Sequence, residues 1–305
     1  MRSHSVLVPI SLALVVLIWG LNTVAVKALY QHISPVAYLG TRFLTLLPLV
    51  YLLARFTGHK IELKEGTLKQ LLAASLLGFG IPQLLGYIAL DHTSAFASSL
   101  IGATSPIATL AICAVMRYET VTGARWLGAF ICITGLLIFQ GCFTGTLTTQ
   151  GGEGMALAAA VMASIHTVMV GRLVRHYHPI LLLFWIMTLS ALMITPFCLG
   201  SLLAQSWSAV TIADWSLILG SAILPILVGH PLWHWAIKHL GAGASSLWVL
   251  LCPLVAGTFS VIFLGAQVYP HETLGALVAL SGLLLSQLPR EKLVKAVAYL
   301  KRARS

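Results

Sequence analysis

The sequence predicts an all-α polytopic membrane protein with ten transmembrane helices in two inverted five-helix repeats. Three observations predict this fold: an apolar composition, an internal repeat, and positive charge confined to alternate loops. Of the 305 residues, 58% are hydrophobic and only 9% are charged, whereas a soluble domain carries about 25% charged residues. A chain of this length has room for about ten spans of ~20 residues each.

The second half of the chain repeats the first. Residues 89–137 align without a gap on residues 236–284, and the densest match sets Ala97–Leu100 against Ala244–Leu247. A repeat with an odd number of spans must place its second copy with reversed topology, a construction common among secondary transporters. Three residues recur 147 positions later: Pro106 as Pro253, Gly128 as Gly275, and Gly135 as Gly282.

Short loops with Gly or Pro at their ends separate ten apolar segments, and no stretch is polar enough for a separate soluble domain. The first repeat covers residues 6–140, the second covers residues 151–288, and a basic tail follows at 289–305. The predicted helices are Val6–Leu29, Pro35–Ala54, Leu68–Leu90, Ser94–Met116, Gly123–Gln140, Gly151–Leu173, Pro179–Leu203, Trp215–Lys238, Ala242–Gly265 and Thr273–Leu288.

Positive charge fixes the expected orientation. All but two of the 18 Lys and Arg residues lie at the N-terminus, in alternate loops or in the tail, and the exceptions, Lys27 and Arg42, belong to helices. Because Lys and Arg accumulate on the cytoplasmic side, both termini are predicted to be cytoplasmic. The net charge of +10 is therefore explained by topology, and no nucleic-acid partner is expected.

The first two spans carry the first candidate binding residues. Asn22 lies near mid-span with Trp19 three residues earlier on the same helix face, which suits either a cavity wall or helix packing. Arg42 lies roughly 12 Å inside the second span, where a charge costs several kcal/mol unless it is paired or hydrated. It is expected either to attract an anionic group such as a substrate carboxylate or to bind backbone carbonyls at helix ends.

Prolines mark where helices can open. Pro82 and Pro225 fall in the corresponding third and eighth helices, and Pro106 and Pro253 in the fourth and ninth. Proline frees a carbonyl one turn earlier, and symmetric interruptions point to a binding site and to gating, although a packing kink is the alternative. Residues expected near these kinks, either lining a cavity or packing helices closely, are Gln83, Tyr87, Ser98, Ser99, Ser245, Ser246 and Trp248.

Histidines form the remaining polar positions. His166 lies in the middle of the sixth helix, and His230 and His234 flank Trp233 in the eighth. The i, i+4 spacing occurs in zinc helices, but no third ligand is near in sequence, so no metal or other cofactor is expected. The histidines are predicted to serve either as polar contacts between helices or in substrate or proton binding, with Trp233 on the cavity wall.

Acidic residues are absent from the predicted membrane interior. All eight lie in loops or at helix ends, so the deep carboxylate that proton- and sodium-coupled transporters commonly use is missing. Paired acids for an aspartyl protease and a Gly-x-Ser-x-Gly element are missing too, and no catalytic residue is predicted. Two hypotheses compete with a secondary transporter: an intramembrane enzyme that uses its histidines, and a membrane protein without transport activity.

The chain resembles the EamA-type drug/metabolite transporter superfamily. Residues 19–27 read Trp-Gly-Leu-Asn-Thr-Val-Ala-Val-Lys, and residues 34–43 read Ser-Pro-Val-Ala-Tyr-Leu-Gly-Thr-Arg-Phe. Glu119 precedes Gly128 by nine residues. Family members often carry a second Glu at the end of the ninth helix, but the matching position here is Ala266. A contact that the glutamates of symmetric members make in both repeats therefore cannot form twice in this chain.

The resemblance implies a central cavity and the export or exchange of small metabolites across a bacterial inner (plasma) membrane. We expect a secondary transporter of amino acids or related compounds that works by alternating access. The aromatic and amide lining suits a zwitterionic or partly apolar solute, and the lack of a buried acid disfavours a strongly cationic one. Besides this solute, the expected partner is the lipid bilayer, and a homodimer is compatible with the sequence.

Overall fold

The computed structural model describes residues 4–92, 101–102, 104–139, 141, 151–264 and 269–287. All regular elements within these ranges are helices, so the fold is all-α. The first half contains α1 (His4–Leu29), α2 (Pro35–Phe56), α3 (Leu68–Ser75), η1 (Leu76–Gly80), α4 (Ile81–Asp91), α6 (Thr104–Val115) and α7 (Gly123–Phe139). The second contains α8 (Glu153–Leu173), α9 (Pro179–Ala204), η2 (Trp207–Ala209), α10 (Ile212–Ile223), η3 (Leu224–Gly229), α11 (His230–Leu240), α12 (Ala242–Ser246), η4 (Leu247–Leu251), α13 (Cys252–Leu264) and α14 (Pro270–Ser286).

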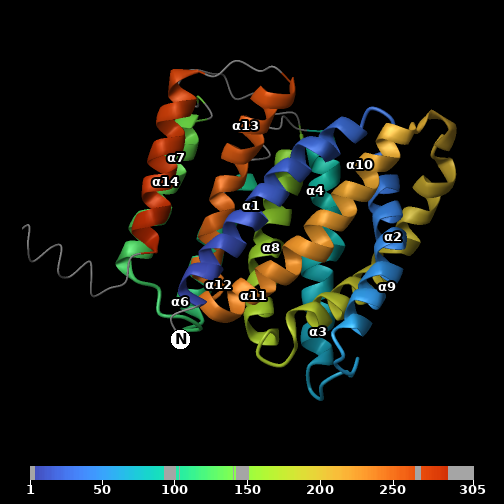
Figure 1. Cartoon of the computed structure of the whole chain (residues 1–305), viewed down its shortest axis with the longest axis horizontal. Helices are drawn as coiled ribbons and strands as arrows, with labels where there is room; N and C mark the ends of the chain where they lie inside the picture. The colour runs from blue at the N-terminus through green and yellow to red at the C-terminus, as the bar shows by residue number, and fades with distance from the viewer. Residues whose placement is uncertain are drawn as a thin grey trace, which may run out of the picture.

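The helices form the predicted polytopic membrane bundle (Figure 1). In the described chain, seven helical segments are long and apolar enough to cross a membrane, and three shorter apolar helices occupy the remaining predicted spans. The eighth span begins at Ile212 rather than Trp215, because Thr211 and Asp214 form a capping box that starts the helix earlier. The basic tail predicted at 289–305 lies outside the described residues.

Equivalent signals start α2 and α9. The Ser34 hydroxyl accepts a hydrogen bond from the Ala37 N–H at 3.3 Å, and the His178 ring accepts one from the Ile180 N–H at 3.4 Å. Each cap precedes a proline at the first helical position, where the missing N–H has no helical partner to lose. These two helices then pack along each other on one side of the bundle (Figure 1).

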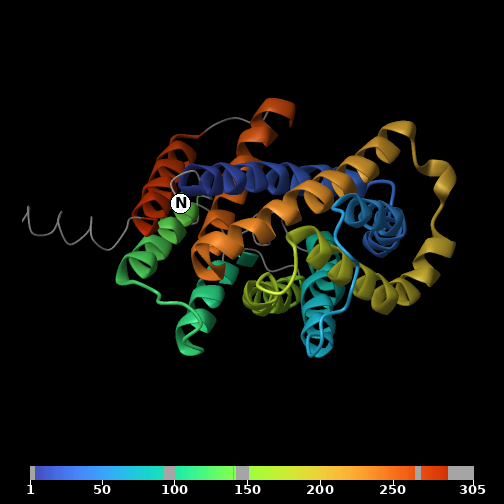
Figure 2. The same ribbon diagram turned by 60° about the horizontal axis from the view of Figure 1, so that its bottom comes forward.

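The helices α7 and α14 lie side by side in both views (Figures 1 and 2) and pack through glycines. A β-carbon added at Gly128 would lie 2.5 Å from the Gly282 carbonyl oxygen, and one at Gly135 would lie 2.8 Å from that of Gly275. The two helices are therefore antiparallel, and each contact is the image of the other under the sequence repeat. Between them, the Cys132 thiol lies 3.1 Å from the carbonyl oxygen of Ala279, its own counterpart. A pseudo-two-fold axis thus passes between these residues, as two inverted copies require.

The third and eighth spans share an internal distortion. Each contains a π-helical segment, η1 or η3, followed by an eleven-residue α-helix, α4 or α11. Both α-helices follow a glycine and carry proline at their second residue, so the structural counterpart of Pro82 is Pro231. Pro225, which the sequence pairs with Pro82, lies earlier, inside η3. π-Helical turns leave carbonyls unpaired within the helix and often accompany functional sites.

Two polar contacts tie helix ends together. The Lys27 ammonium donates to the Leu90 carbonyl oxygen at 2.8 Å, where a positive charge complements the end of α4. The Glu119 carboxylate accepts from the backbone N–H groups of Ala242 and Gly243, where a negative charge complements the start of α12. The second contact joins the first repeat to the second.

Candidate functional site

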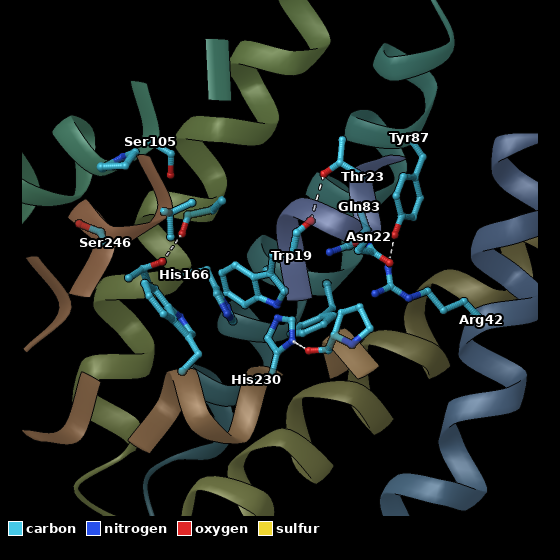
Figure 3. A pocket seen from close by; sticks show the side chains of 18 residues that line it. Trp19, Asn22, Thr23, Arg42, Gln83, Tyr87, Ser105, His166, His230 and Ser246 are labelled. Atoms are coloured by element: carbon cyan, nitrogen blue, oxygen red, sulfur yellow. Dashed lines mark hydrogen bonds between the residues drawn. The ribbon is translucent and has the colours of Figure 1, made fainter. Parts of the chain in front are cut away.

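A cavity of about 330 Å³ lies where the two repeats meet (Figure 3). Its volume is at the lower end of the range of small-molecule sites, which suits a ligand of metabolite size. Helices of both repeats contribute, including the two π-helical segments. The lining residues are Trp19, Asn22, Thr23, Arg42, Gly78, Phe79, Gln83, Tyr87, Ser105, Pro106, Ala163, His166, Thr167, Pro225, His230, Trp233, Ser246 and Val249.

Arg42 is the centre of a polar corner in this cavity. Its side chain is only 5% exposed, and one terminal nitrogen donates to the Gln83 amide oxygen at 3.1 Å and to the Tyr87 hydroxyl. The Tyr87 ring stands edge-on to the fully buried Tyr38, whose hydroxyl is 2.9 Å from that of Ser221 in α10. Arg42 is therefore fixed by side chains of α4 rather than by backbone carbonyls at helix ends.

Aromatic rings form the wall beside this corner. The Trp19 ring centroid lies 5.0 Å from that of His230 and 5.3 Å from that of Trp233. Phe79 contacts both histidines, with centroids 4.6 Å from His230 and 6.0 Å from His166. Such faces can attract a substrate cation as well as apolar groups.

Glycines in the π-helical spans allow two of these rings to approach closely. Gly78 in η1 lies so near the His166 ring that a β-carbon would overlap it, and one at Gly229 in η3 would lie 2.9 Å from Trp19 Nε1. Each ring comes from the first helix of one repeat and meets the third helix of the other. His166 also lies 147 positions after Trp19, the offset of the sequence repeat, so the two rings are counterparts. The glycines are not, because Gly229 precedes α11 as Gly80, and not Gly78, precedes α4.

Backbone carbonyls of the distorted spans orient the cavity histidines. His166 Nδ1 is 2.8 Å from the Ala74 carbonyl oxygen, and His230 Nδ1 is 2.8 Å from that of Pro225. A carbonyl oxygen only accepts hydrogen bonds, so each Nδ1 carries the proton that it donates. In the neutral ring, Nε2 is then an acceptor.

The cavity carries one permanent charge. Among the described lining residues, Arg42 is the single charged side chain and none carries a carboxylate. Within the described residues, no three His, Cys, Asp or Glu side chains gather closely enough to hold a metal ion. The site is therefore suited to binding an anionic or dipolar molecule.

Most predicted site residues meet in this cavity. Pro106 and Pro225 line it, whereas Pro82 lines a neighbouring cavity that shares Gln83. Trp248 and Pro253 do not line it; Trp248 packs between two core clusters, and Ser98 lies outside the described residues. Besides these prolines, the predicted residues in the lining are Trp19, Asn22, Arg42, Gln83, Tyr87, His166, His230, Trp233 and Ser246.

Several lining residues were not predicted. Phe79 and Gly78 belong to η1, and Ser105 and Thr167 lie on α6 and α8. A usable signal was present at η1 and η3, because each ends in a glycine placed two residues before a proline. For Ser105 and Thr167 we find no such signal, since small hydroxyl side chains are common throughout membrane helices.

A model of the EamA-like transporter family matches residues 7–140 and 150–288, most of the chain. The chain belongs to the EamA-like transporter family. One relative is a probable amino-acid metabolite efflux pump of Salmonella typhimurium, 24% identical over 290 residues, which cover 90% of this chain and 92% of that protein. Another is an uncharacterized transporter of Archaeoglobus fulgidus, 24% identical over 277 residues, or 90% and 96% of the two chains.

A protein of known crystal structure has the same fold. It matches with a TM-score of 0.75 over 94% of this chain and 98% of the other, at 16% sequence identity. Together with the apolar helices, the EamA-like match identifies the chain as an integral membrane protein with a general role in transport.

Proposed function

We propose that the protein is a secondary transporter that exports or exchanges amino acids or closely related metabolites by alternating access between its two repeats. We further propose that it resides in a bacterial inner membrane with both termini in the cytoplasm. The observation that carries the substrate class is the cavity itself, whose described lining contains one buried guanidinium, aromatic walls and no carboxylate.

The buried guanidinium favours a substrate with a carboxylate. Arg42 has donors beyond those used by Gln83 and Tyr87, and its Nε–H is buried without a partner in the described structure. A carboxylate accepts such donors in charge-assisted hydrogen bonds. The Salmonella typhimurium relative, a probable amino-acid metabolite efflux pump, agrees with this substrate class.

Alternating access is supported by how the cavity is built. Both repeats supply its walls, and the helices on either side contain π-helical segments. Rocking one inverted repeat against the other around such a site opens it to each side of the membrane in turn. The contact between Glu119 and the start of α12 would have to break when the repeats separate at that end.

Counterflow into proteoliposomes tests the proposal. Vesicles loaded with each of the twenty standard amino acids in turn are diluted into buffer with the same amino acid carrying a radioactive label. We expect label to accumulate for a subset of them. Arg42→Gln should raise the half-saturating concentration about tenfold or more, since a hydrogen bond to a charged group contributes about 1.5–3 kcal/mol.

The matched control is Arg172→Gln. Arg172 lies outside the cavity, with its guanidinium 5.3 Å from the Tyr118 ring, and its replacement should leave half-saturation unchanged. Melting curves of each purified variant separate lost binding from lost folding. If no amino acid shows counterflow with well-folded protein, the proposed substrate class is wrong.

A further inference from the structure

The hydrogen bonds already made around the cavity leave free donors on one side and free acceptors on the other. The first repeat supplies the donor side. The Gln83 amide oxygen and the Tyr87 hydroxyl oxygen both accept from Arg42. Gln83 is therefore left with its N–H groups and Arg42 with its remaining N–H groups, whereas the Tyr87 hydroxyl is also hydrogen-bonded to Tyr38. This corner, built from α2 and α4, presents hydrogen-bond donors to a ligand.

The second repeat presents the opposite polarity. His166 and His230 donate through Nδ1 to the carbonyls of Ala74 and Pro225, so Nε2 is the group that each neutral ring offers. In the described structure no side chain or backbone group is hydrogen-bonded to either Nε2, and both rings line the cavity. The wall formed by α8 and α11 therefore presents acceptors.

The side chains between the donor corner and the acceptor wall agree with this separation of donors from acceptors. Figure 3 shows Arg42, Gln83 and Tyr87 together on one side of the cavity, His166 on the other, and Trp19 and His230 between them. His230 lies against the rings of Trp19 and Phe79, whose faces attract cations. Asn22 adds an amide oxygen that is buried without a partner in the described structure.

We propose that the substrate lies across the two repeats, with its carboxylate on Arg42 and Gln83 of the first and its ammonium group on the Nε2 acceptors of His230 and His166 in the second. This inference rests on the proposed function and assigns the two charged ends of the amino acid to different halves of the protein. No carboxylate is needed to hold the ammonium group, because imidazole acceptors and aromatic faces replace it.

The arrangement also couples substrate occupancy to movement. A molecule held at both ends contacts both repeats, so it stabilises those relative positions in which donors and acceptors are the right distance apart. A ligand shifts a conformational equilibrium only through such a difference in affinity between states. A molecule with only one charged end contacts one repeat and is expected to bind without being carried across efficiently.

The test uses an amino acid and its two half-molecules. For leucine these are 4-methylpentanoate, which lacks the ammonium group, and 3-methylbutylamine, which lacks the carboxylate; the same triad is made for any other amino acid that shows counterflow. His230→Leu removes the acceptor and keeps an apolar side chain, whereas His230→Gln retains an amide oxygen. His234→Gln is the matched control, because His234 lies one turn further along α11 and does not line the cavity.

We expect His230→Leu to raise the half-saturating concentration of the amino acid about tenfold or more. The concentration of the carboxylate half-molecule that half-inhibits counterflow of the amino acid should rise less than about threefold, because only the amino acid uses the acceptor. His230→Gln should recover part of the loss, and Arg42→Gln should weaken the amino acid and the carboxylate half-molecule alike. His234→Gln should leave all three unchanged.

The outcomes separate this inference from the proposed function. If the amino acid is transported but His230→Leu weakens it and the carboxylate half-molecule equally, the ammonium group is not held by His230 and the inference is overturned while the function stands. Equal weakening by His234→Gln would also overturn it. If no amino acid is transported at all, the inference and the proposed function are both wrong.

Discussion

Gly78 and His166 pack so tightly that a side chain at position 78 would occupy the space of the imidazole ring. The contact holds the ring against η1, where Nδ1 reaches the Ala74 carbonyl. The position and tautomer of a cavity histidine thus depend on a glycine in another helix and in the other repeat.

Gly78→Ala is expected to destabilise the protein by about 1–3 kcal/mol, because overpacking forces neighbours out of place. It should also impair counterflow, because His166 must move. The control is Gly86→Ala in α4, where a β-carbon would have its nearest neighbour at 4.0 Å; that variant should be neutral or slightly stabilised. Melting curves and counterflow assays on both variants check this, and equal effects of the two substitutions would contradict it.

Glu119→Ala should lower the free energy of unfolding by about 1–3 kcal/mol, because the N–H groups of Ala242 and Gly243 lose a charged acceptor. Glu119→Gln keeps an uncharged acceptor and should lose less. Glu62 provides the control: it is exposed and 3.7 Å from Lys60, and such surface pairs contribute little. Thermal melts in detergent decide the matter; a Glu119→Ala variant as stable as Glu62→Ala would show that the contact does not matter.

His178 is expected to make the protein less stable in acid. Partial desolvation, together with the nearby His59 and Lys238, lowers the pKa of His178 below its usual value of 6.5. The unfolded chain then binds more protons than the folded chain just below that pH, so the contribution is fully present above pH 6.5 and is lost as the pH falls through this window.

His178→Asn should reduce the fall in melting temperature between about pH 7.5 and about pH 5.5, while an Asn side chain can still cap α9. His176→Asn, at an exposed neighbouring position, is the control and should keep the wild-type dependence. An unchanged pH dependence in His178→Asn would rule out this residue as a source of acid sensitivity.

Orientation is testable with single cysteines placed in loops. In a variant whose five native cysteines are replaced by alanine, Gln31→Cys should react with a membrane-impermeant maleimide on intact cells. His59→Cys should react only after the membrane is opened, because the loop that carries it contains the basic residues that mark the cytoplasmic side. Both positions are exposed. The reverse pattern would mean that the termini face outward.

The order and extent of the helices could be predicted from the sequence, because apolar length and loop charge are local properties. Arg42 and the histidines could be recognised as candidates, because polar groups are costly inside a membrane. Their contacts could not be predicted, because only packing between helices that are distant in sequence brings Gln83 to Arg42 and His230 to Trp19.

The π-helical segments are the clearest example of a feature that the sequence did not predict. One additional residue in a turn leaves hydropathy and helix length nearly unchanged, yet it shifts the register of every residue that follows. The prediction therefore paired Pro82 with Pro225, which lies within η3, when the structural counterpart is Pro231. Trp248 was expected in the cavity for a related reason: it lies in η4, where the tighter turn changes which residues share a face.

The glycine contact between α7 and α14 has a consequence for how such a protein can originate. Because the interface is self-complementary, a chain comprising one repeat would already carry both of its surfaces and could pair with an inverted copy of itself. In that assembly every residue occurs twice, so a donor corner would face a second donor corner. Once the two copies are joined in one chain, the sequence of each repeat can change independently. Arg42 in one half can then face His166 and His230 in the other.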